Sequence, residues 1–173
     1  MDDGLDWLGP RGRDGGIDSI PLPLPVGGLS LCGKHAVGVD VSAALARCGA
    51  TTVICLVERH EIVDRYPHYV EWLQREAGRR AVWFPIHDLH APALDDAAAL
   101  VDLIVARVHR GEHLLMHCAA GIGRAGTIAA CVLIALGMDP ASALTHVAQH
   151  RPMAGPEVGP QRLLVDAYGA QFG

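Results

Sequence analysis

A cysteine and an arginine, separated by five residues, stand out as a pair that could do chemistry. They lie in the segment His117-Cys118-Ala119-Ala120-Gly121-Ile122-Gly123-Arg124-Ala125-Gly126-Thr127. A cysteine thiolate is a nucleophile, and a guanidinium can hold two oxygens of a tetrahedral oxyanion. The loop is expected to enter a helix, whose free N–H groups and dipole favour both an anion and the thiolate form of Cys118. The segment therefore predicts a cradle for a phosphate group beside a reactive cysteine.

Two other interpretations of this glycine-rich loop fail. Gly121, Gly123 and Gly126 match the dinucleotide fingerprint G-x-G-x-x-G, but that fold needs a second strand with an acidic end about 20 residues further on. The window instead contains Leu144 to His150, which has a helical pattern. A nucleotide P-loop would need a lysine before Thr127, and the sequence has none there.

The spacing of Cys118 and Arg124 resembles the signature of the cysteine-dependent protein tyrosine and dual-specificity phosphatases, which is His-Cys, five residues and Arg. A second match is Asp88-Leu89-His90-Ala91-Pro92, which is similar to the acid loop of that family, an Asp followed four positions later by Pro. The resemblance runs from about Ile17 to the C-terminus. It is closest to the kinase-associated phosphatase-like branch of small atypical dual-specificity enzymes.

The resemblance implies a two-step reaction that uses no metal or other cofactor. Cys118 would attack phosphorus while Asp88 protonates the leaving oxygen, and water would then release phosphate from a cysteinyl-phosphate. Arg124 and the loop amides would stabilise the charge on the equatorial oxygens. The expected phosphate-binding residues are Ala119, Ala120, Gly121, Ile122, Gly123 and Arg124.

Three further residues are expected to assist. His117 would orient the cysteine loop, and Gln161, which follows Gly159-Pro160, looks like the glutamine that positions the hydrolytic water in relatives. Many relatives carry Ser or Thr after the arginine, where this chain has Ala125, so we expect slower breakdown of the intermediate unless Thr127 substitutes. Cys55 is a candidate partner for a protective disulfide with Cys118 under oxidation, as in some relatives.

The expected substrates are phosphorylated protein side chains, with dual specificity for phosphotyrosine and for phosphoserine or phosphothreonine. Lipid phosphatases of the superfamily place lysines inside the cysteine loop, whereas this loop offers Ala119, Ala120 and Ile122, which argues against polyphosphoinositides. Two rival classes stay open: a non-catalytic phosphate-binding module, and a cysteine enzyme of another chemistry such as sulfur transfer or arsenate reduction.

Alternating strand and helix patterns must position these residues. Strands are expected at 51–57, 81–86 and 113–117 and helices at 40–48, 69–77, 95–109, 127–136, 141–150 and 160–170, with Asp95 or Asp96 as a helix cap. Because the strands are apolar throughout, the fold class is α/β, with a single domain and a mostly parallel central sheet flanked by helices. Residues 1–28, rich in Gly, Pro and Asp, are expected to be irregular, and residues 29–173 to form the catalytic domain.

Composition excludes several classes of protein. With 14 basic and 19 acidic residues the net charge is −5, which does not suggest nucleic-acid binding. Five unpatterned cysteines favour a reducing compartment, and no apolar run approaches the ~20 residues that span a bilayer. We therefore expect a cytoplasmic protein without membrane contact, of unknown oligomeric state. His146 and His150 are spaced like zinc ligands but lack the accompanying glutamate, so no metal site is expected there.

Overall fold

The computed structural model describes residues 16–173 and contains one five-stranded sheet in the order β1-β2-β5-β3-β4. The strands are β1 (Asp18–Ile20), β2 (Gly28–Gly33), β3 (Thr52–Cys55), β4 (Ala81–Trp83) and β5 (His113–Cys118). Strands β2, β5, β3 and β4 are parallel, and β1 pairs with β2 in the antiparallel direction. The expected mostly parallel α/β sheet is confirmed.

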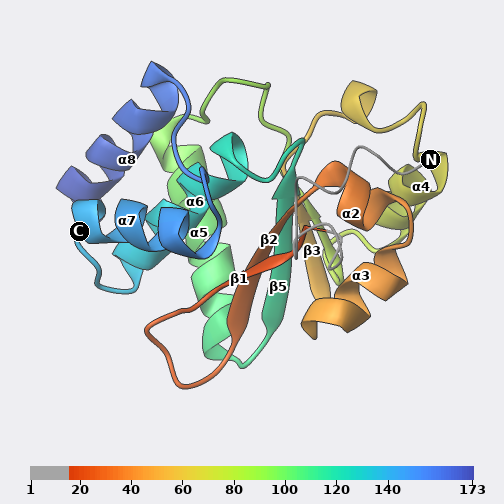
Figure 1. Cartoon of the computed structure of the whole chain (residues 1–173), viewed down its shortest axis with the longest axis horizontal. Helices are drawn as coiled ribbons and strands as arrows, with labels where there is room; N and C mark the ends of the chain where they lie inside the picture. The colour runs from red at the N-terminus through yellow and green to blue at the C-terminus, as the bar shows by residue number, and fades with distance from the viewer. Residues whose placement is uncertain (1–15) are drawn as a thin grey trace.

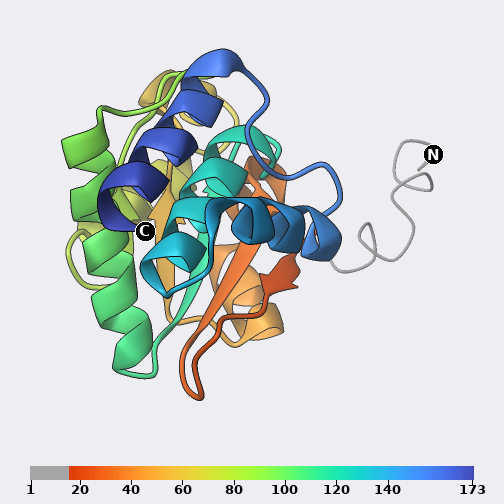
Figure 2. The same cartoon turned by 90° about the vertical axis from the view of Figure 1, so that its left-hand side faces the viewer.

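Helices cover both faces of this sheet (Figure 1). One face carries α2 (Lys34–Gly38), α3 (Val41–Cys48) and α4 (Pro67–Arg75), and the other carries α5 (Leu94–His109), α6 (Gly123–Ala135), α7 (Pro140–His150) and α8 (Gly159–Phe172). A short 3-10 helix, η2 (Arg59–Glu61), follows β3. Figure 2 views the second layer from outside, with α5 to α8 in front of the sheet. Among the described residues, no helix combines the length and apolarity needed to cross a membrane.

The most buried helix is the one that leaves the cysteine loop. Every residue of α6 except its last is buried, and the helix packs against β5, α5, α7 and α8. A helix that is apolar on all sides is stable only when it is enclosed in this way. The start of α6, and with it the cysteine loop, is therefore held by the core.

Local sequence signals account for several helix boundaries. The Asp40 side chain accepts a hydrogen bond from the Ala43 N–H at 3.0 Å, and Gly49 ends α3 with φ +70°. Asp139 caps α7 in the same way through the Ser142 N–H at 2.9 Å. The expected caps at Asp95 and Asp96 are wrong. Helix α5 begins at Leu94 without a side-chain cap, and the two aspartates lie in its first turn. Their negative charges interact favourably with the positive end of the helix dipole there.

The expectation of an irregular segment up to residue 28 needs correction within the described chain. Asp18–Ile20 form β1 against Leu29–Leu31 of β2, and β2 itself begins at Gly28. A three-residue edge strand carries too short a pattern to be recognised, because its pairing depends on the strand beside it. The proline-rich run from Pro21 to Pro25 does connect β1 to β2 without regular structure, and residues 1–15 lie outside the described chain.

The segments that follow β3, β4 and β5 gather at one edge of the sheet, at the top of Figure 1. They contain η2, the segment with Asp88 and the cysteine loop. The carboxyl ends of parallel strands meet at one edge, which is where open α/β sheets bind ligands. The fold therefore brings the two motifs of the sequence, Asp88 and Cys118, to the same edge.

Candidate active site

The cysteine loop is a tight turn between β5 and α6. Cys118 is the last residue of β5 and is buried, and α6 begins at Gly123. Gly121 has φ +72°, and a Cβ on it would lie 2.4 Å from the carbonyl oxygen of Cys32. A Cβ on Gly126 would lie 2.2 Å from the backbone nitrogen of Gly155. Two of the glycines that match the dinucleotide fingerprint are therefore needed here, Gly121 for the turn and Gly126 for close backbone packing.

Arg124 lies on the inner side of this loop with almost no exposed surface. Its guanidinium donates to both carboxylate oxygens of Glu61, at 2.9 Å each, and to the carbonyl of Ile86 at 2.8 Å. Its Nη2 also lies 3.2 Å from Oδ1 of Asp88. Burial by itself lowers the pKa of Arg124, but the hydrogen bonds and charge of Glu61 and the other nearby groups raise it above its ordinary value. Arg124 is therefore a permanent cation beside the loop.

Glu61 is the carboxylate partner of that arginine, and sequence reasoning missed it. Burial raises the pKa of Glu61, but the hydrogen bonds from Arg124 outweigh this effect and hold it below its ordinary value. The carboxylate also accepts the backbone N–H of Glu58 at 2.8 Å, so it is fixed by the turn that carries it. The sequence carried one signal for Glu61: it follows shortly after a predicted strand, and the ends of parallel strands meet at one edge of the sheet.

His117, expected to orient the loop, is fully buried beneath it. Its Nδ1 lies 3.0 Å from the carbonyl oxygen of Cys118, and its Nε2 lies 2.5 Å from the hydroxyl of Tyr69. A carbonyl only accepts, so Nδ1 carries the proton and Nε2 accepts from Tyr69. Burial lowers the pKa of His117 to about 4 and raises that of Tyr69. The pair is therefore neutral, and it fixes the carbonyl of Cys118.

Asp88 lies at the rim, with 62% of its side chain exposed. Its Oδ1 accepts the N–H of Leu89 at 3.0 Å, and Leu89 itself has φ +61°. The ring of His90 donates from Nδ1 to the carbonyl of Asp88 at 2.8 Å. This turn, with the contact to Arg124, places the candidate acid between solvent and the cysteine loop.

Gln161 connects the Asp88 segment to the other side of the site. It is buried near the start of α8, donates to the carbonyl of His90 at 3.3 Å and accepts from the N–H of Glu157 at 2.8 Å. A Cβ on Gly123 would lie 3.2 Å from its Oε1, so the amide borders the start of α6. The structure therefore brings Gln161 together with the Asp88 segment and the loop.

Thr127, Ala125 and Cys55 are the remaining residues singled out by the sequence. The hydroxyl of Thr127 donates to the carbonyl of Gly123 at 2.6 Å, one helical turn back, and Ala125 is fully buried. Cys55 and Cys118 are both free thiols. The register of β3 and β5 pairs Cys55 with His117 rather than with Cys118.

Arg151, a second buried arginine, supports the loop from its outer side. Its Nε donates to the carbonyl of Gly121 at 2.7 Å and its Nη2 to that of Ala120 at 2.9 Å. Its Nη1 donates to the carboxylate of Asp18 at 2.8 Å, so β1 and the loop share one side chain. The sequence did not mark Arg151 as part of the site, because it follows α7, some thirty residues after the loop.

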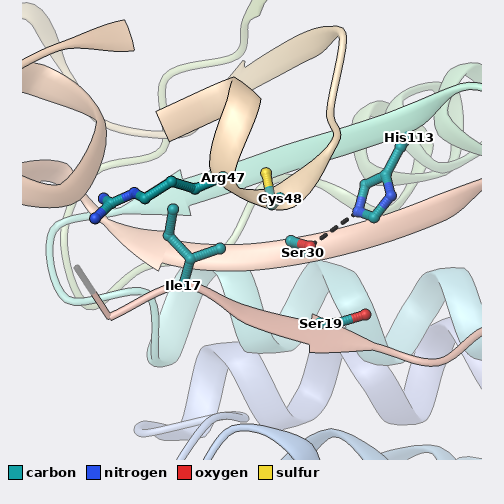
Figure 3. Close-up of a pocket in the computed structure, with 6 residues that line it drawn as sticks. All are labelled: Ile17, Ser19, Ser30, Arg47, Cys48 and His113. Atoms are coloured by element: carbon teal, nitrogen blue, oxygen red, sulfur yellow. Dashed lines mark hydrogen bonds between the residues drawn. The ribbon is translucent and has the colours of Figure 1, made fainter. Parts of the chain in front are cut away.

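A separate hollow of about 260 Å³ lies between the β1 and β2 strands and the end of α3 (Figure 3). Ser30 and His113 face it and share a hydrogen bond of 2.9 Å, and Arg47 and Cys48 border it. His113 begins β5 whereas Cys118 ends it. This hollow therefore lies at the opposite end of β5 from the candidate site.

Metal-ligating side chains also gather near the site. Within residues 16–173, one group of at least three has ligand atoms all within 4.8 Å of one another, formed by Glu58, His60 and Glu61. The histidines that imitate zinc ligands in the sequence bind backbone instead. His146 Nε2 lies 2.7 Å from the carbonyl of Pro21, and His150 Nδ1 lies 2.8 Å from that of His146.

The chain is similar in sequence to one family of phosphatase domains and in fold to solved phosphatase structures. Residues 29–163 match the family PTP-SAK, described as the Swiss Army Knife protein, DSP-PTPase phosphatase domain. No curated protein sequence matches the chain.

Solved structures of phosphatases have the same fold. Tk-PTP in its active form is 25% identical, with a TM-score of 0.69 over 89% of this chain and 97% of its own. Kinase associated phosphatase, with its catalytic-site cysteine replaced by serine, is 19% identical, with a TM-score of 0.71 over 90% and 94% of the two chains. Human DUSP28 is 21% identical, with a TM-score of 0.64 over 82% and 88%.

The fold and the matched domain define a phosphatase of the dual-specificity phosphatase superfamily. Within it, the chain belongs to the PTP-SAK family, because the match covers most of its length. The resemblance inferred from Cys118, Arg124 and Asp88 is confirmed at the level of the superfamily.

Proposed function

We propose that this phosphatase hydrolyses phosphate esters on phosphorylated protein side chains through a cysteinyl-phosphate intermediate. The observation that carries the proposal is the meeting of two separate motifs at one guanidinium. Arg124 comes from the cysteine loop, and its Nη2 lies 3.2 Å from Asp88, which comes from the segment after β4. This contact supports a site in which a nucleophile, an anion-binding cation and a candidate acid act together, as phosphoryl transfer requires.

In the first step the Cys118 thiolate attacks phosphorus and the bond to the leaving oxygen breaks. Asp88, protonated at that moment, gives its proton to the leaving oxygen. Loop N–H groups and Arg124 hold the three equatorial oxygens, on which the transition-state charge is spread. Phosphate oxygens would replace Asp88 as partners of Arg124, which frees Asp88 to face the leaving group.

In the second step Asp88 takes a proton from water as that water attacks the cysteinyl-phosphate, and the Cys118 thiolate leaves. We assign the positioning of this water to Gln161, whose amide borders both the Asp88 segment and the loop. The hydroxyl of Thr127 donates to Gly123, so it would have to leave that carbonyl before it could stabilise the departing thiolate.

Protein side chains are the proposed substrates because the loop is small and uncharged apart from Arg124. Ala119, Ala120 and Ile122 add no lysine that could meet a second phosphate group. A lipid phosphate is the second candidate. PTPMT1, which is 17% identical with a TM-score of 0.64, has been solved in complex with PI(5)P. We place the activity in the cytoplasm, in keeping with five free cysteines.

Hydrolysis of p-nitrophenyl phosphate in the presence of a chelator tests the mechanism. Wild type should be active, Cys118→Ser inactive, and Asp88→Asn slower in kcat by about 10²- to 10⁴-fold. A wild type that binds phosphate but does not turn over would support the non-catalytic phosphate-binding module instead. If the kcat of Asp88→Asn equalled that of wild type, the result would favour another cysteine chemistry.

Substrate class needs its own comparison. Phosphotyrosine, phosphoserine and phosphothreonine peptides should be hydrolysed with a higher kcat/KM than PI(5)P in mixed micelles. The reverse order would assign the enzyme to lipid phosphates, with the catalytic mechanism unchanged.

A further inference from the structure

Lys34 is the only lysine in the sequence, and the fold places it beside the cysteine loop. It is the first residue of α2, directly after β2, and its N–H donates to the carbonyl of Ala119 at 3.0 Å. Its Nζ donates to the backbone carbonyl of Glu61 at 3.1 Å. Because the side chain of Glu61 holds Arg124, the turn that positions the first cation of the candidate site also contacts a second one.

The ammonium of Lys34 keeps donors for a further partner. An ammonium has three N–H donors, and the structure gives Nζ one hydrogen bond, to a neutral carbonyl. Within residues 16–173, no carboxylate forms an ion pair with Lys34. The residue is only half-buried, so an anion can reach the remaining donors from solvent.

The glutamates of the neighbouring turn already have other partners. Both carboxylate oxygens of Glu61 accept from Arg124 at 2.9 Å. Oε2 of Glu58 lies 3.0 Å from Nδ1 of His87. These carboxylates therefore leave the charge of Lys34 unpaired.

Arg65, a second cation, extends the same surface. Its guanidinium carbon lies 5.7 Å from the ring centre of Tyr66, and the hydroxyl of Tyr66 shares a hydrogen bond with Nδ1 of His35, the residue after Lys34. Arg65 is exposed and forms no ion pair in the part of the chain that the structure describes. Burial and the positive charges of Arg65 and Lys34 lower the pKa of His35. Both cations therefore act on one small region beside the loop.

We propose that Lys34 and Arg65 bind an acidic side chain of the substrate, so that the enzyme prefers a phosphorylated residue with an aspartate or glutamate close to it in the peptide. This preference rests on the proposed function. Arg124 and the loop N–H groups take the phosphate, and the Lys34–Arg65 pair takes the carboxylate through charge-assisted hydrogen bonds. Lys34 contacts both the loop and the turn of Glu61, so the carboxylate belongs to a residue near the phosphorylated one.

The balance of charge favours a peptide over an anionic lipid surface. The chain has a net charge of −5, and the segment that carries Arg65 also contains Glu58 and Asp64. An extended anionic surface would meet these carboxylates and be repelled. A single acidic side chain can contact the two cations without approaching the rest of the segment.

Paired phosphotyrosine peptides, which differ only in Asp or Asn beside the phosphotyrosine, test the preference. In wild type, kcat/KM should be about fivefold higher for the Asp peptide, the size expected of an exposed charge pair. The ratio of the two kcat/KM values should fall toward one in Lys34→Met and decrease in Arg65→Met, whereas Lys34→Arg should keep it because the charge remains. Arg75→Met is the matched control, since it removes an exposed cation from the last turn of α4 and should keep the full ratio.

Two results would overturn the subsite. One is equal kcat/KM for the two peptides in wild type, or a ratio that survives in Lys34→Met. The other is a loss of activity in Lys34→Met that is confined to PI(5)P in mixed micelles, which would assign the charge to a lipid headgroup.

Binding to Cys118→Ser separates the subsite from the reaction. Fluorescence anisotropy should give a Kd about fivefold lower for the Asp peptide than for the Asn peptide, and added salt should reduce the difference. Because the sequence has one lysine, acetylation of Lys34 by acetic anhydride can be followed by mass spectrometry, and the Asp peptide should slow it more. Equal Kd values and equal protection would refute the subsite. A wild type that hydrolyses neither peptide, with the difference in Kd intact, would refute the proposed function and leave the subsite standing.

Discussion

Two buried arginines flank the cysteine loop, and their partners differ in kind. On the outer side, Arg151 donates to the backbone carbonyls of Ala120 and Gly121, which are part of the loop itself. On the inner side, Arg124 donates to the carboxylate of Glu61 and to the carbonyl of Ile86, and it forms an ion pair with the carboxylate of Asp88. A backbone partner cannot leave without a change in the shape of the loop, whereas a side-chain carboxylate can be exchanged for an oxyanion.

The contrast assigns different tasks to two residues of the same type. Arg151 holds the loop in shape and ties it to β1 through Asp18. We propose that Arg124 keeps a guanidinium in place for a ligand, with Glu61 as a fixed partner and the exposed Asp88 as a replaceable one. Substitutions on the inner side should therefore affect catalysis, and substitutions on the outer side should affect stability.

The largest effect is expected from Arg124→Lys. Lysine keeps the positive charge but cannot hold two oxygens at once, and loss of an arginine that stabilises a phosphoryl-transfer transition state costs about 10³- to 10⁵-fold. We expect kcat/KM for p-nitrophenyl phosphate to fall within this range. A variant that loses stability while retaining turnover would reverse the contrast between the two sides.

Arg151→Met should chiefly lower stability. The change removes the guanidinium from buried loop carbonyls and from Asp18, and breaking a buried ion pair costs about 3–5 kcal/mol. Urea denaturation should show a loss of this size. Arg162→Met is the control, because Arg162 pairs on the surface with Asp166 at 3.1 Å, and such a helix pair contributes about 0.3–0.5 kcal/mol. Equal losses in the two variants would show that Arg151 does not hold the loop.

Glu61→Gln should produce an intermediate loss of activity. The amide accepts with one oxygen only, so the orientation of Arg124 becomes less well defined, and small misplacements of catalytic groups cost up to about 10²-fold. We expect kcat/KM to fall about tenfold or more, with a smaller loss of stability than in Arg151→Met. Glu71→Gln, which changes an exposed glutamate of α4, should leave kcat/KM unaltered. Full activity in Glu61→Gln would show that Arg124 needs no fixed partner.

The smallest effect concerns the dependence of stability on pH at His117, beneath the loop. Burial lowers the pKa of His117 from 6.5 to about 4, so between these values the unfolded chain binds a proton that the folded chain does not. Stability therefore rises with pH through this window and is lost as the pH falls. His35 and His113, whose pKa values burial also lowers, act in the same direction.

A comparison with His117→Gln isolates this contribution. The pKa of His117 is 6.5 in the unfolded chain and about 4 in the fold. Between pH 4.5 and 6, inside this window, the slope of the unfolding free energy against pH should be less steep in the variant by up to about 1.4 kcal/mol per pH unit. Urea denaturation at several pH values measures it, with His68→Asn as an exposed control. Parallel slopes in wild type and His117→Gln would show that His117 is not held neutral in the fold.

Local signals predicted much of the fold, and their limits are visible in particular elements. Asp40 and Gly49 mark the ends of α3, and Asp139-Pro140 marks the start of α7, because caps and breakers act within a few residues. Strands β1 and β2 and helix α2 were not predicted. All three are short, and each depends on partners that only the assembled fold supplies: β2 pairs with β5, and β1 and α2 contact β2.

The sequence by itself determined the chemistry that the candidate site offers: a cysteine and an arginine separated by five residues, in a glycine-rich turn before a helix, and an aspartate in a second motif. These signals are local and need no knowledge of the rest of the chain. The tertiary structure decided which distant side chains complete the site, Glu61 on the inner side and Arg151 on the outer side. Those partners come from segments that only meet when the sheet is assembled, and spacing along the chain carries no information about that distance.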